Sequence, residues 1–305
     1  MSQPAIRLGT RASKLALTQS NWVKSQLESH GHAVELIEIK TEGDIKTGPL
    51  AQIGGQGLFT KRLQIALVEK EVDLAVHSMK DLPTEDHADL MIASVPAREN
   101  TSDALICRNG VKDFQSLPQD AKIGTGSVRR AAQLLHLRPD LKIHDIRGNV
   151  DTRLEKLVSE GFDGIILACA GLNIMGLSDR ITHAFSEAEL LPAVGQGALA
   201  LEIRKADQAT HEAVKKLSHD ESFWRAMAER SMLRRLFAGC LAPVGAVTRI
   251  EGGELSLTGV VLSRDGKTRI EAQTTGAVEA AIELGVEVAE KLFANGAKAL
   301  LEDRA

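Results

Sequence analysis

The sequence is poor in aromatic side chains and has no excess of basic ones. It contains no tyrosine, and aromatic residues make up 3% of the chain. Proteins that bind nucleic acid usually neutralise phosphates with a surplus of lysine and arginine, and they often stack bases on aromatic rings. Here 37 Lys and Arg stand against 41 Asp and Glu, so the net charge is −4. The composition therefore argues against a nucleic-acid-binding protein.

Cysteines and long apolar runs are also scarce. The three cysteines have no CxxC spacing and are odd in number, which argues against a disulfide framework and favours a reducing compartment. No run approaches the roughly 18 apolar residues that a membrane-spanning helix needs. The first residues, MSQPAIRLGTRASK, place Arg7 and Arg11 where a signal peptide would be apolar. We therefore expect a cytoplasmic protein.

Short apolar runs alternate with amphipathic stretches through the first two thirds of the 305 residues. This alternation is typical of βαβ units, and strands that are apolar almost throughout favour mainly parallel sheets buried on both faces. The expected strands are 33–39, 73–76, 90–95, 104–107, 122–125, 143–146, 164–168 and 198–203. Helices are expected at 128–137 and 150–160, and a further helical stripe is formed by Phe59, Leu63, Ala66 and Leu67.

Two segments look like domain seams. Residues 96–101 are polar and begin with proline, and residues 191–197 are punctuated by proline and glycine. Beyond them the pattern changes to a helix at 221–237, two adjacent strands at 244–250 and 254–261, and a closing helix at 277–294. The end of the chain therefore resembles a small α+β domain.

Three arginine-bearing turns each connect a strand to a helix, at residues 10–13, 124–130 and 147–153. Free backbone N–H groups and the helix dipole make such junctions anion sites, and arginine adds bidentate recognition of carboxylates. Taken singly, an arginine in such a turn is more often a solvated surface residue. Three together favour a polyanionic small molecule at the carboxyl ends of the strands. No GxxxxGK[ST] loop or clean GxGxxG is present, so a nucleotide is not the expected ligand.

Two further segments carry reactive groups. Asp81 lies in HSMKDLP directly after an expected strand, where it is either a functional carboxylate or a turn residue that caps backbone N–H groups. Cys240 lies on a loop, where Gly239 is expected to end the preceding helix. A loop thiol is a candidate functional group, whereas Cys107 and Cys169 fall in apolar runs and are expected in the core.

His30 and His32 flank a glycine at the expected end of a helix. Two histidines alone fall short of the three or four ligands of a typical zinc site. We therefore expect solvent-facing side chains here and predict no metal site.

Five motifs, in this order, resemble the porphobilinogen deaminase family, also called the hydroxymethylbilane synthase family. They are HSMKDLP, TGSVRR, IRGNVDTRL, LPAVGQGAL and ERSMLRRLFAGCLAPVG. The resemblance runs from Ile6 to about Leu301. It implies an α/β fold with two periplasmic-binding-protein-like lobes and a small C-terminal α+β domain. The implied domains are 1–97 with 198–216, 98–197, and 217–305.

The resemblance also implies an activity. Enzymes of this family join four porphobilinogen units head to tail, release ammonia each time, and free the linear tetrapyrrole hydroxymethylbilane. The chain grows on a dipyrromethane cofactor held by a thioether, here to Cys240, and the matching catalytic residue is Asp81. The expected partner is the small molecule porphobilinogen. Binding of nucleic acid, membrane or metal is not expected. The protein is expected to be a monomer in the cytoplasm.

Each pyrrole carries an acetate and a propionate, which would account for the arginine-bearing turns. By position, the matching cofactor contacts are Ser13, Lys80, Thr125, Ser127, Arg129, Arg130 and Arg147. The matching substrate contacts are Arg11, Arg153 and Phe59.

The chain departs from the family pattern at four places: Gln56, Gly126, Ile174 and Leu241. Gln56 replaces a usual lysine and Ile174 a usual arginine, so two cations that could contact carboxylates are missing. Two alternatives therefore stay open beside the deaminase. One is a diverged paralogue with weak or altered activity, and the other is a two-lobed binder of carboxylated ligands without turnover.

Overall fold

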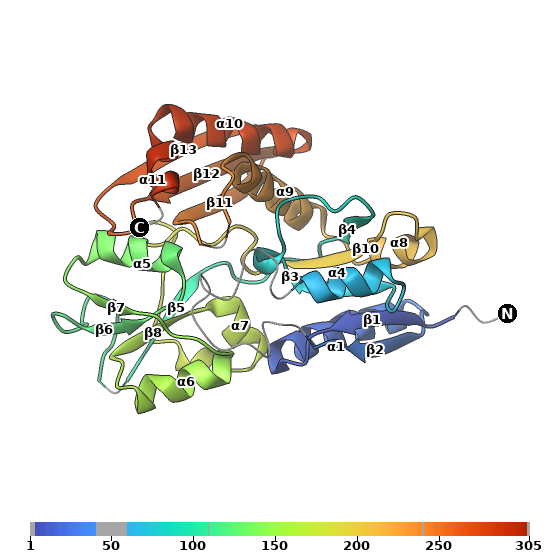
Figure 1. Cartoon of the computed structure of the whole chain (residues 1–305), viewed down its shortest axis with the longest axis horizontal. Coiled ribbons are helices and arrows are strands. Elements are labelled where there is room, and N and C mark those ends of the chain that lie inside the picture. Colours follow the sequence, from blue (N-terminus) through green and yellow to red (C-terminus); the bar gives the residue numbers. More distant parts are fainter. Residues whose placement is uncertain (1–3, 41–59, 109, 240, 304–305) are drawn as a thin grey trace. The chain divides into compact units, whose positions relative to one another are not determined.

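The computed structural model describes residues 4–40, 60–108, 110–239 and 241–303. The chain divides into two compact units, Met1–Glu99 with Ala198–Phe223, and Asn100–Gly197 with Trp224–Ala305. Figure 1 labels their elements. Each unit is described by itself below.

The first unit is built on a five-stranded sheet with the order β2-β1-β3-β10-β4. Its strands are β1 (Ile6–Thr10), β2 (Val34–Glu38), β3 (Leu74–Ser78), β4 (Leu90–Ser94) and β10 (Leu199–Arg204). Strands β1, β2 and β3 are parallel, and β10 runs antiparallel to both of its neighbours. The segment after residue 197 therefore returns to the first sheet, as the resemblance implies.

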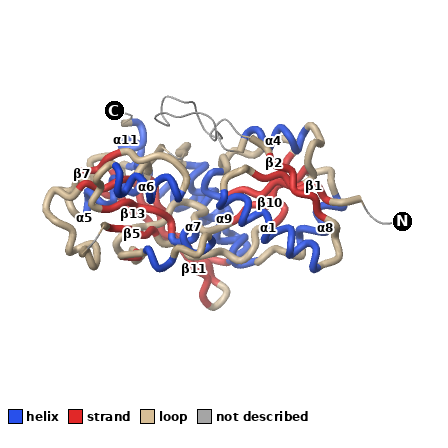
Figure 2. Tube along the Cα trace, turned by 90° about the horizontal axis from the view of Figure 1, so that it is seen from below, coloured by secondary structure: helices blue, strands red, loops and turns tan. Residues whose placement is uncertain are grey.

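Helices cover both faces of this sheet. Helices α1 (Lys14–Ser29) and α8 (Gln208–Lys215) pack on the face to which Leu74 and Val76 point. Helix α4 (Lys61–Val68) packs on the opposite face, against Ala75. Figure 2 shows the two groups of helices on either side of the strands. Successive residues of β3 point to opposite faces, so one apolar strand serves both layers.

The second unit contains a five-stranded sheet with the order β7-β6-β8-β5-β9. Its strands are β5 (Asp103–Cys107), β6 (Lys122–Gly124), β7 (Lys142–His144), β8 (Gly164–Ala168) and β9 (His183–Ala184). Helix α5 (Val128–Leu137) packs on one face, and α6 (Val150–Ser159) and α7 (Cys169–Ile174) pack on the other. A short 3₁₀ helix, η2 (Ser178–Arg180), follows α7.

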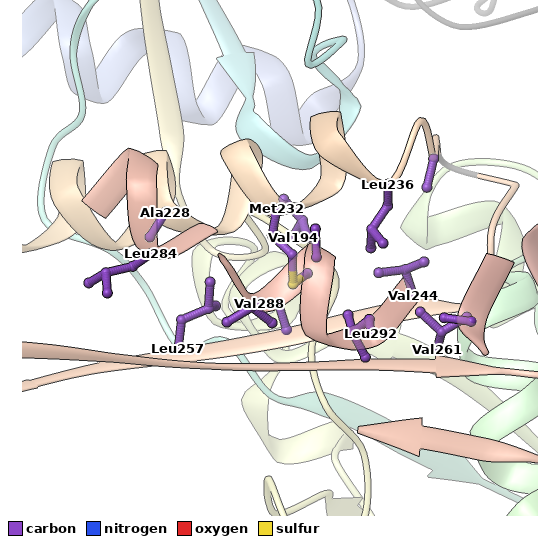
Figure 3. Close-up of a cluster of buried hydrophobic side chains, with 14 of the residues drawn as sticks. Val194, Ala228, Met232, Leu236, Val244, Leu257, Val261, Leu284, Val288 and Leu292 are labelled. Carbon is purple, nitrogen blue, oxygen red and sulfur yellow. The ribbon is translucent and has the colours of Figure 1, made fainter. Parts of the chain in front are cut away.

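The end of the chain adds an antiparallel three-stranded sheet to the second unit. It consists of β11 (Val244–Glu251), β12 (Glu254–Leu262) and β13 (Arg269–Ala277), with η3 (Val278–Ala280) following. Helices α9 (Asp220–Arg235), α10 (Ala281–Ala294) and α11 (Ala297–Glu302) complete it. Figure 3 shows its apolar core, where Met232 of α9 lies above Val288 of α10, Val288 lies beside Leu257 of β12, and Leu292 lies nearer Val244 and Val261.

The predicted fold class, an α/β protein with two sheet-containing lobes and a small C-terminal domain, is confirmed. In the described part of the chain, each five-stranded sheet is parallel except for one strand, β10 or β5. Each of these is the first strand after the chain passes from one unit to the other. The helix expected from residue 277 begins at 281, because the preceding residues form β13 and η3. The boundaries of the three domains stay a prediction.

Candidate active site

In the first unit, two predicted turns meet at one edge of the sheet. Strands β1 and β3 are parallel neighbours, with Leu8 opposite Leu74 and Gly9 opposite Ala75. Their carboxyl ends therefore lie at the same edge, where ligands bind in open α/β sheets. Arg11 and Ser13 follow β1, and Lys80 and Asp81 follow β3. The fold thus brings together groups that are almost 70 residues apart in the sequence.

Asp81 lies on an anchored turn but has an exposed side chain. It ends the 3₁₀ helix η1 (Met79–Asp81), whose Met79 N–H donates to the Ala198 carbonyl at 2.9 Å. Met79 and Leu82, on either side, are 1% and 5% exposed. Within the described residues, the Asp81 carboxylate makes no hydrogen bond or ion pair. The turn-capping alternative is therefore not what the structure shows, and the carboxylate is available to a ligand.

Ser13 is the N-cap of α1. Its Oγ accepts a hydrogen bond from the Ala16 N–H at 3.4 Å. Because a hydroxyl both donates and accepts, this contact orients the oxygen and leaves the proton to be donated. A ligand carboxylate is a suitable acceptor for it.

In the second unit, the same arrangement recurs at the parallel neighbours β6 and β7. Thr125 and Ser127 follow β6. The Ser127 N–H donates to Thr125 Oγ1 at 3.2 Å, and the Arg130 N–H donates to Ser127 Oγ at 3.4 Å. Both hydroxyls are oriented by the backbone and keep a proton to donate.

Two arginines follow β7 at this same edge. Arg147 Nε contacts Asp145 Oδ2 at 3.1 Å, and its side chain is 31% exposed. Arg153 Nε donates to the Gly148 carbonyl at 2.8 Å, and Asn149 caps the intervening helix start. Both guanidinium groups are therefore held beside the first turn of α6, where the helix dipole also favours an anion.

Arg129 and Arg130 are buried, with exposures of 4% and 5%. Arg129 Nη1 and Arg130 Nη2 each lie 2.7 Å from an oxygen of Asp103, which is fully buried. Burial alone would raise the pKa of Asp103, but the two guanidinium charges outweigh it and hold that pKa far below its usual range. The alternative of solvated surface arginines is therefore wrong for this pair.

The cluster around Asp103 carries an unsatisfied positive charge. Two arginines share one carboxylate, which leaves one cation uncompensated. Arg129 Nη1 also donates to the Leu191 carbonyl at 2.7 Å, and Arg130 Nη1 donates to the Ile166 carbonyl at 3.0 Å. The buried Nε of Arg129 has no hydrogen-bond partner. An anionic group such as a carboxylate suits both the charge and the orphaned donor.

The cysteines separate as predicted, as far as the structure describes them. Cys169 is buried, and Cys107 packs partly buried against the core. Burial raises the pKa of each thiol to about 11, so both are protonated and unreactive near neutral pH. Cys240, Phe59 and Gln56 lie outside the described residues.

The departures from the family pattern have different structural contexts. A Cβ at Gly126 would lie 2.9 Å from Asp145 Oδ1 and 3.0 Å from the Ile146 carbonyl, so glycine suits the local packing. Ile174 ends α7, and Leu241 is 37% exposed. Nothing in the structure explains the last two substitutions.

Sequence reasoning missed the polar groups that support the site from within. Asp103 opens an apolar strand, and Gln196 Nε2 donates to it at 2.9 Å. His77 and Glu202 form a buried pair on β3 and β10. A polar residue in an otherwise apolar strand was the feature that could have indicated these groups. The sequence does not show which residue pairs with it, because the pairing residue is far away along the chain.

The described residues include no group of three or more His, Cys, Asp or Glu placed to hold a metal ion. His30 forms the C-cap of α1. Over the same residues, no helix is both long and apolar enough to cross a membrane.

Comparisons of the sequence with known proteins point to one family. The model of the porphobilinogen deaminase dipyrromethane cofactor-binding domain matches residues 6–212, and that of the porphobilinogen deaminase C-terminal domain matches 223–294. The chain belongs to the porphobilinogen deaminase family. The porphobilinogen deaminase of Trichlorobacter lovleyi is 46% identical, over 99% of this chain and 97% of that one. The Desulforamulus reducens porphobilinogen deaminase is 47% identical, over 98% and 97% respectively.

Some solved structures resemble the chain weakly. The methionine-binding protein MetQ has a TM-score of 0.45 at 12% identity, covering 72% of this chain and 90% of that one. A lipoprotein of the YaeC family from Enterococcus faecalis has a TM-score of 0.44 at 16% identity, covering 72% and 93%.

Membership in the porphobilinogen deaminase family makes the chain a transferase of tetrapyrrole synthesis with a dipyrromethane cofactor-binding domain. The residues present fit such a cofactor. Its acetate and propionate groups are the anions that the orphaned Arg129 Nε and the oriented hydroxyls of Thr125 and Ser127 can bind.

Proposed function

We propose that the chain is a hydroxymethylbilane synthase that condenses four porphobilinogen units into the linear tetrapyrrole, with release of four ammonia. The observation that carries this proposal is Asp81, an exposed carboxylate on a turn anchored by Met79 and Leu82 at the carboxyl end of β3. We also propose that the enzyme acts in the cytoplasm as a monomer.

In this proposal Asp81 acts through its charge. Loss of ammonia from the aminomethyl group of porphobilinogen leaves positive charge on the pyrrole. A carboxylate close to the pyrrole N–H stabilises that charge as it develops. The leaving amine already carries its proton near neutral pH, so proton transfer by Asp81 is the smaller contribution.

The basic and hydroxyl groups bind the carboxylates of the pyrroles. In the first unit these are Arg11, Ser13 and Lys80. In the second unit they are Thr125, Ser127, Arg129, Arg147 and Arg153. Arg130 contributes by sharing Asp103 with Arg129, because three of its N–H groups are already used within the fold. The dipyrromethane, attached through Cys240 when bound, supplies the ring carbon on which the chain grows.

Two departures affect this role. Ile174 cannot bind a carboxylate, and Gln56 lacks the charge of the usual lysine. The groups for cofactor attachment and charge stabilisation, Cys240 and Asp81, are retained. We therefore propose that initiation is intact and that elongation is slower than in relatives that keep both cations.

The test combines an intact mass with an ammonia assay. Protein from cells that make the precursor should exceed its sequence mass by two linked pyrrole units, and Cys240→Ser should remove this excess. Asp81→Asn should keep the added mass but lose about 10²–10³-fold in the rate of ammonia release, because asparagine keeps the volume without the charge. Asp81→Glu should lose less.

An unmodified wild-type mass would refute the attachment at Cys240. Wild-type ammonia release by cofactor-loaded Asp81→Asn would refute the role of Asp81. A wild-type protein that binds porphobilinogen but releases no ammonia would leave only the non-catalytic binder.

A further inference from the structure

A chain of buried polar groups crosses the interior of the first unit close to Asp81. His77 Nε2 lies 2.9 Å from Glu202 Oε2, and the Gln64 side-chain amide donates to Glu202 Oε1 at 2.9 Å. The side chains of His77 and Glu202 are 1% and 5% exposed. The proposed function uses none of these three residues.

This polar network links three elements: the strand that leads into the Asp81 turn, a neighbouring strand and a covering helix. His77 is the last buried residue of β3, four positions before Asp81. Glu202 lies on β10, where Ala200 is opposite His77 and Glu202 is opposite Ala75. Gln64 lies on α4, which packs on that same face. The network therefore ties β3, at the point where it turns toward Asp81, to a neighbouring strand and to a covering helix.

The charge state of Glu202 follows from these contacts. Burial alone would raise its pKa, but the hydrogen bond and charge of His77 and the hydrogen bond from Gln64 lower it overall. The carboxylate is therefore ionised near neutral pH and acts only as an acceptor, so His77 Nε2 carries the hydrogen of the shared bond. Each oxygen has one donor, which allows a single arrangement of the three side chains.

A purely stabilising role does not explain the location of this network. The opposite end of β3 already has a polar cluster, in which Asp73 pairs with Arg7 at 2.8 Å and with Arg204 of β10 at 2.7 Å. Buried ionic groups are seldom more stabilising than well-packed apolar residues. A second buried link between the same strands, directly before the Asp81 turn, suits a demand for precision at that turn.

We propose that His77 and Glu202, with Gln64, are positioning residues for the Asp81 carboxylate. This inference rests on the proposed function of Asp81. The network fixes the direction in which β3 enters the 3₁₀ turn, and the buried Met79 transmits it to Asp81. Misplacement of a catalytic group by about 1 Å can cost up to 10²-fold in rate.

The experiment compares Glu202→Gln and His77→Gln with Asp73→Asn, which breaks the polar cluster at the far end of the same strand. All variants are full-length and confirmed as cofactor-loaded by intact mass. With porphobilinogen as substrate, Glu202→Gln and His77→Gln should lower kcat about tenfold with little change in KM. Asp73→Asn should lower Tm about as much as Glu202→Gln and His77→Gln do, but it should leave kcat within about twofold of the wild-type value.

A double-variant comparison then separates positioning from an independent role. If Glu202 acts through Asp81, adding Glu202→Gln to Asp81→Asn should lower kcat no further. Gln64→Leu is a milder change at the rim of the network and should lower kcat about threefold. It tests the network in place of His77→Gln if that variant does not fold.

The inference is overturned if the Glu202→Gln and His77→Gln variants have the same kcat as Asp73→Asn. It is equally overturned if Glu202→Gln lowers the kcat of the Asp81→Asn enzyme by the same factor by which it lowers the kcat of the wild type. Failure of the proposed function has a different signature, because wild-type protein would then release no ammonia at all.

Discussion

At the residue scale, Phe237 takes a place where glycine is usual. Its φ is +50°, in the left-handed region, and its side chain is 84% exposed. The Phe237 N–H donates to the Arg234 carbonyl at 2.9 Å, and the Ala238 N–H to the Leu233 carbonyl at 3.2 Å. These two bonds form a Schellman motif that ends α9. The prediction that Gly239 ends this helix is therefore wrong, because the helix closes two residues earlier.

Phe237→Gly is expected to stabilise the protein. The left-handed conformation costs an ordinary residue about 1–2 kcal/mol, and the greater freedom of unfolded glycine offsets part of the gain, so a net 0.5–1 kcal/mol is expected. The free energy of unfolding from urea titration measures it. Val158→Gly, at an exposed position inside α6, should instead cost about 1 kcal/mol. Destabilisation by both changes would contradict the prediction.

Asp103 should dominate the acid sensitivity of the protein. Its pKa is lower in the folded than in the unfolded state, so its contribution is complete above the ordinary value near 4 and falls as the pH drops below it. At pH 7, Asp103→Asn should cost about 3–5 kcal/mol, because two buried arginines lose their partner.

Urea titrations at pH 7 and pH 3 test this. The variant should lose less stability between the two values than the wild type does. Asp120→Asn is the control, because Asp120 pairs with Lys142 at the exposed surface and should change stability little. Equal pH dependence in wild type and Asp103→Asn would contradict the assignment.

At the scale of elements, the site is built at helix starts. Ser13 and Ser127 are the N-caps of α1 and α5, and Asn149 is the N-cap of α6. The same hydroxyls that begin two of these helices are the predicted ligand contacts. Folding of each helix therefore orients its donor before any ligand arrives.

Gly126 shows how tightly one of these turns is packed. Gly126→Ser adds a Cβ that would lie 2.9 Å from Asp145 Oδ1 and 3.0 Å from a backbone carbonyl. We expect a loss of about 1–2 kcal/mol and a displaced Arg147, which Asp145 holds. Thermal unfolding measures the loss. Adding Asp145→Ala should recover part of it by making room, and a neutral Gly126→Ser would show that the turn can relax.

At the scale of the whole molecule, the buried cluster around Asp103 stands out because it holds two guanidinium cations and only one carboxylate. Arg129 and Arg130 share Asp103, and one buried guanidinium nitrogen has no partner. A bound dicarboxylate would supply the missing acceptors. Cofactor and fold are then thermodynamically linked, because a group that binds only the native state stabilises it.

Cys240→Ser, which lacks the attachment atom, should therefore unfold at a lower temperature than loaded wild type. A loss of two charge-assisted hydrogen bonds, each about 1.5–3 kcal/mol, predicts a Tm lower by roughly 5–15 °C. Calorimetry of both proteins measures the difference. Wild type from cells without the precursor should match the Cys240→Ser value, and an unchanged Tm in both would exclude the linkage.

The sequence by itself determined the local features of this protein. Apolar alternation predicted most of the strands, and the predicted helix at 128–137 coincides with α5, because period and capping depend on neighbours in the chain. The motif order and the turn residues indicated the family, which the comparisons confirmed. The sequence also predicted that Arg11 and Asp81 each follow a strand, and the pairing of β1 with β3 in the structure places both at the same edge of the sheet.

Only the tertiary structure decided which polar groups meet inside the fold. Asp103 meets Arg129 across 26 residues, and His77 meets Glu202 across 125. No local pattern selects such partners, because strand order and register set which side chains face each other. The same reason buries Arg129 and Arg130, which the sequence placed in an anion-binding turn without indicating that they pair with Asp103. Burial then decided their chemistry, since a buried charge needs a partner and a solvated one does not.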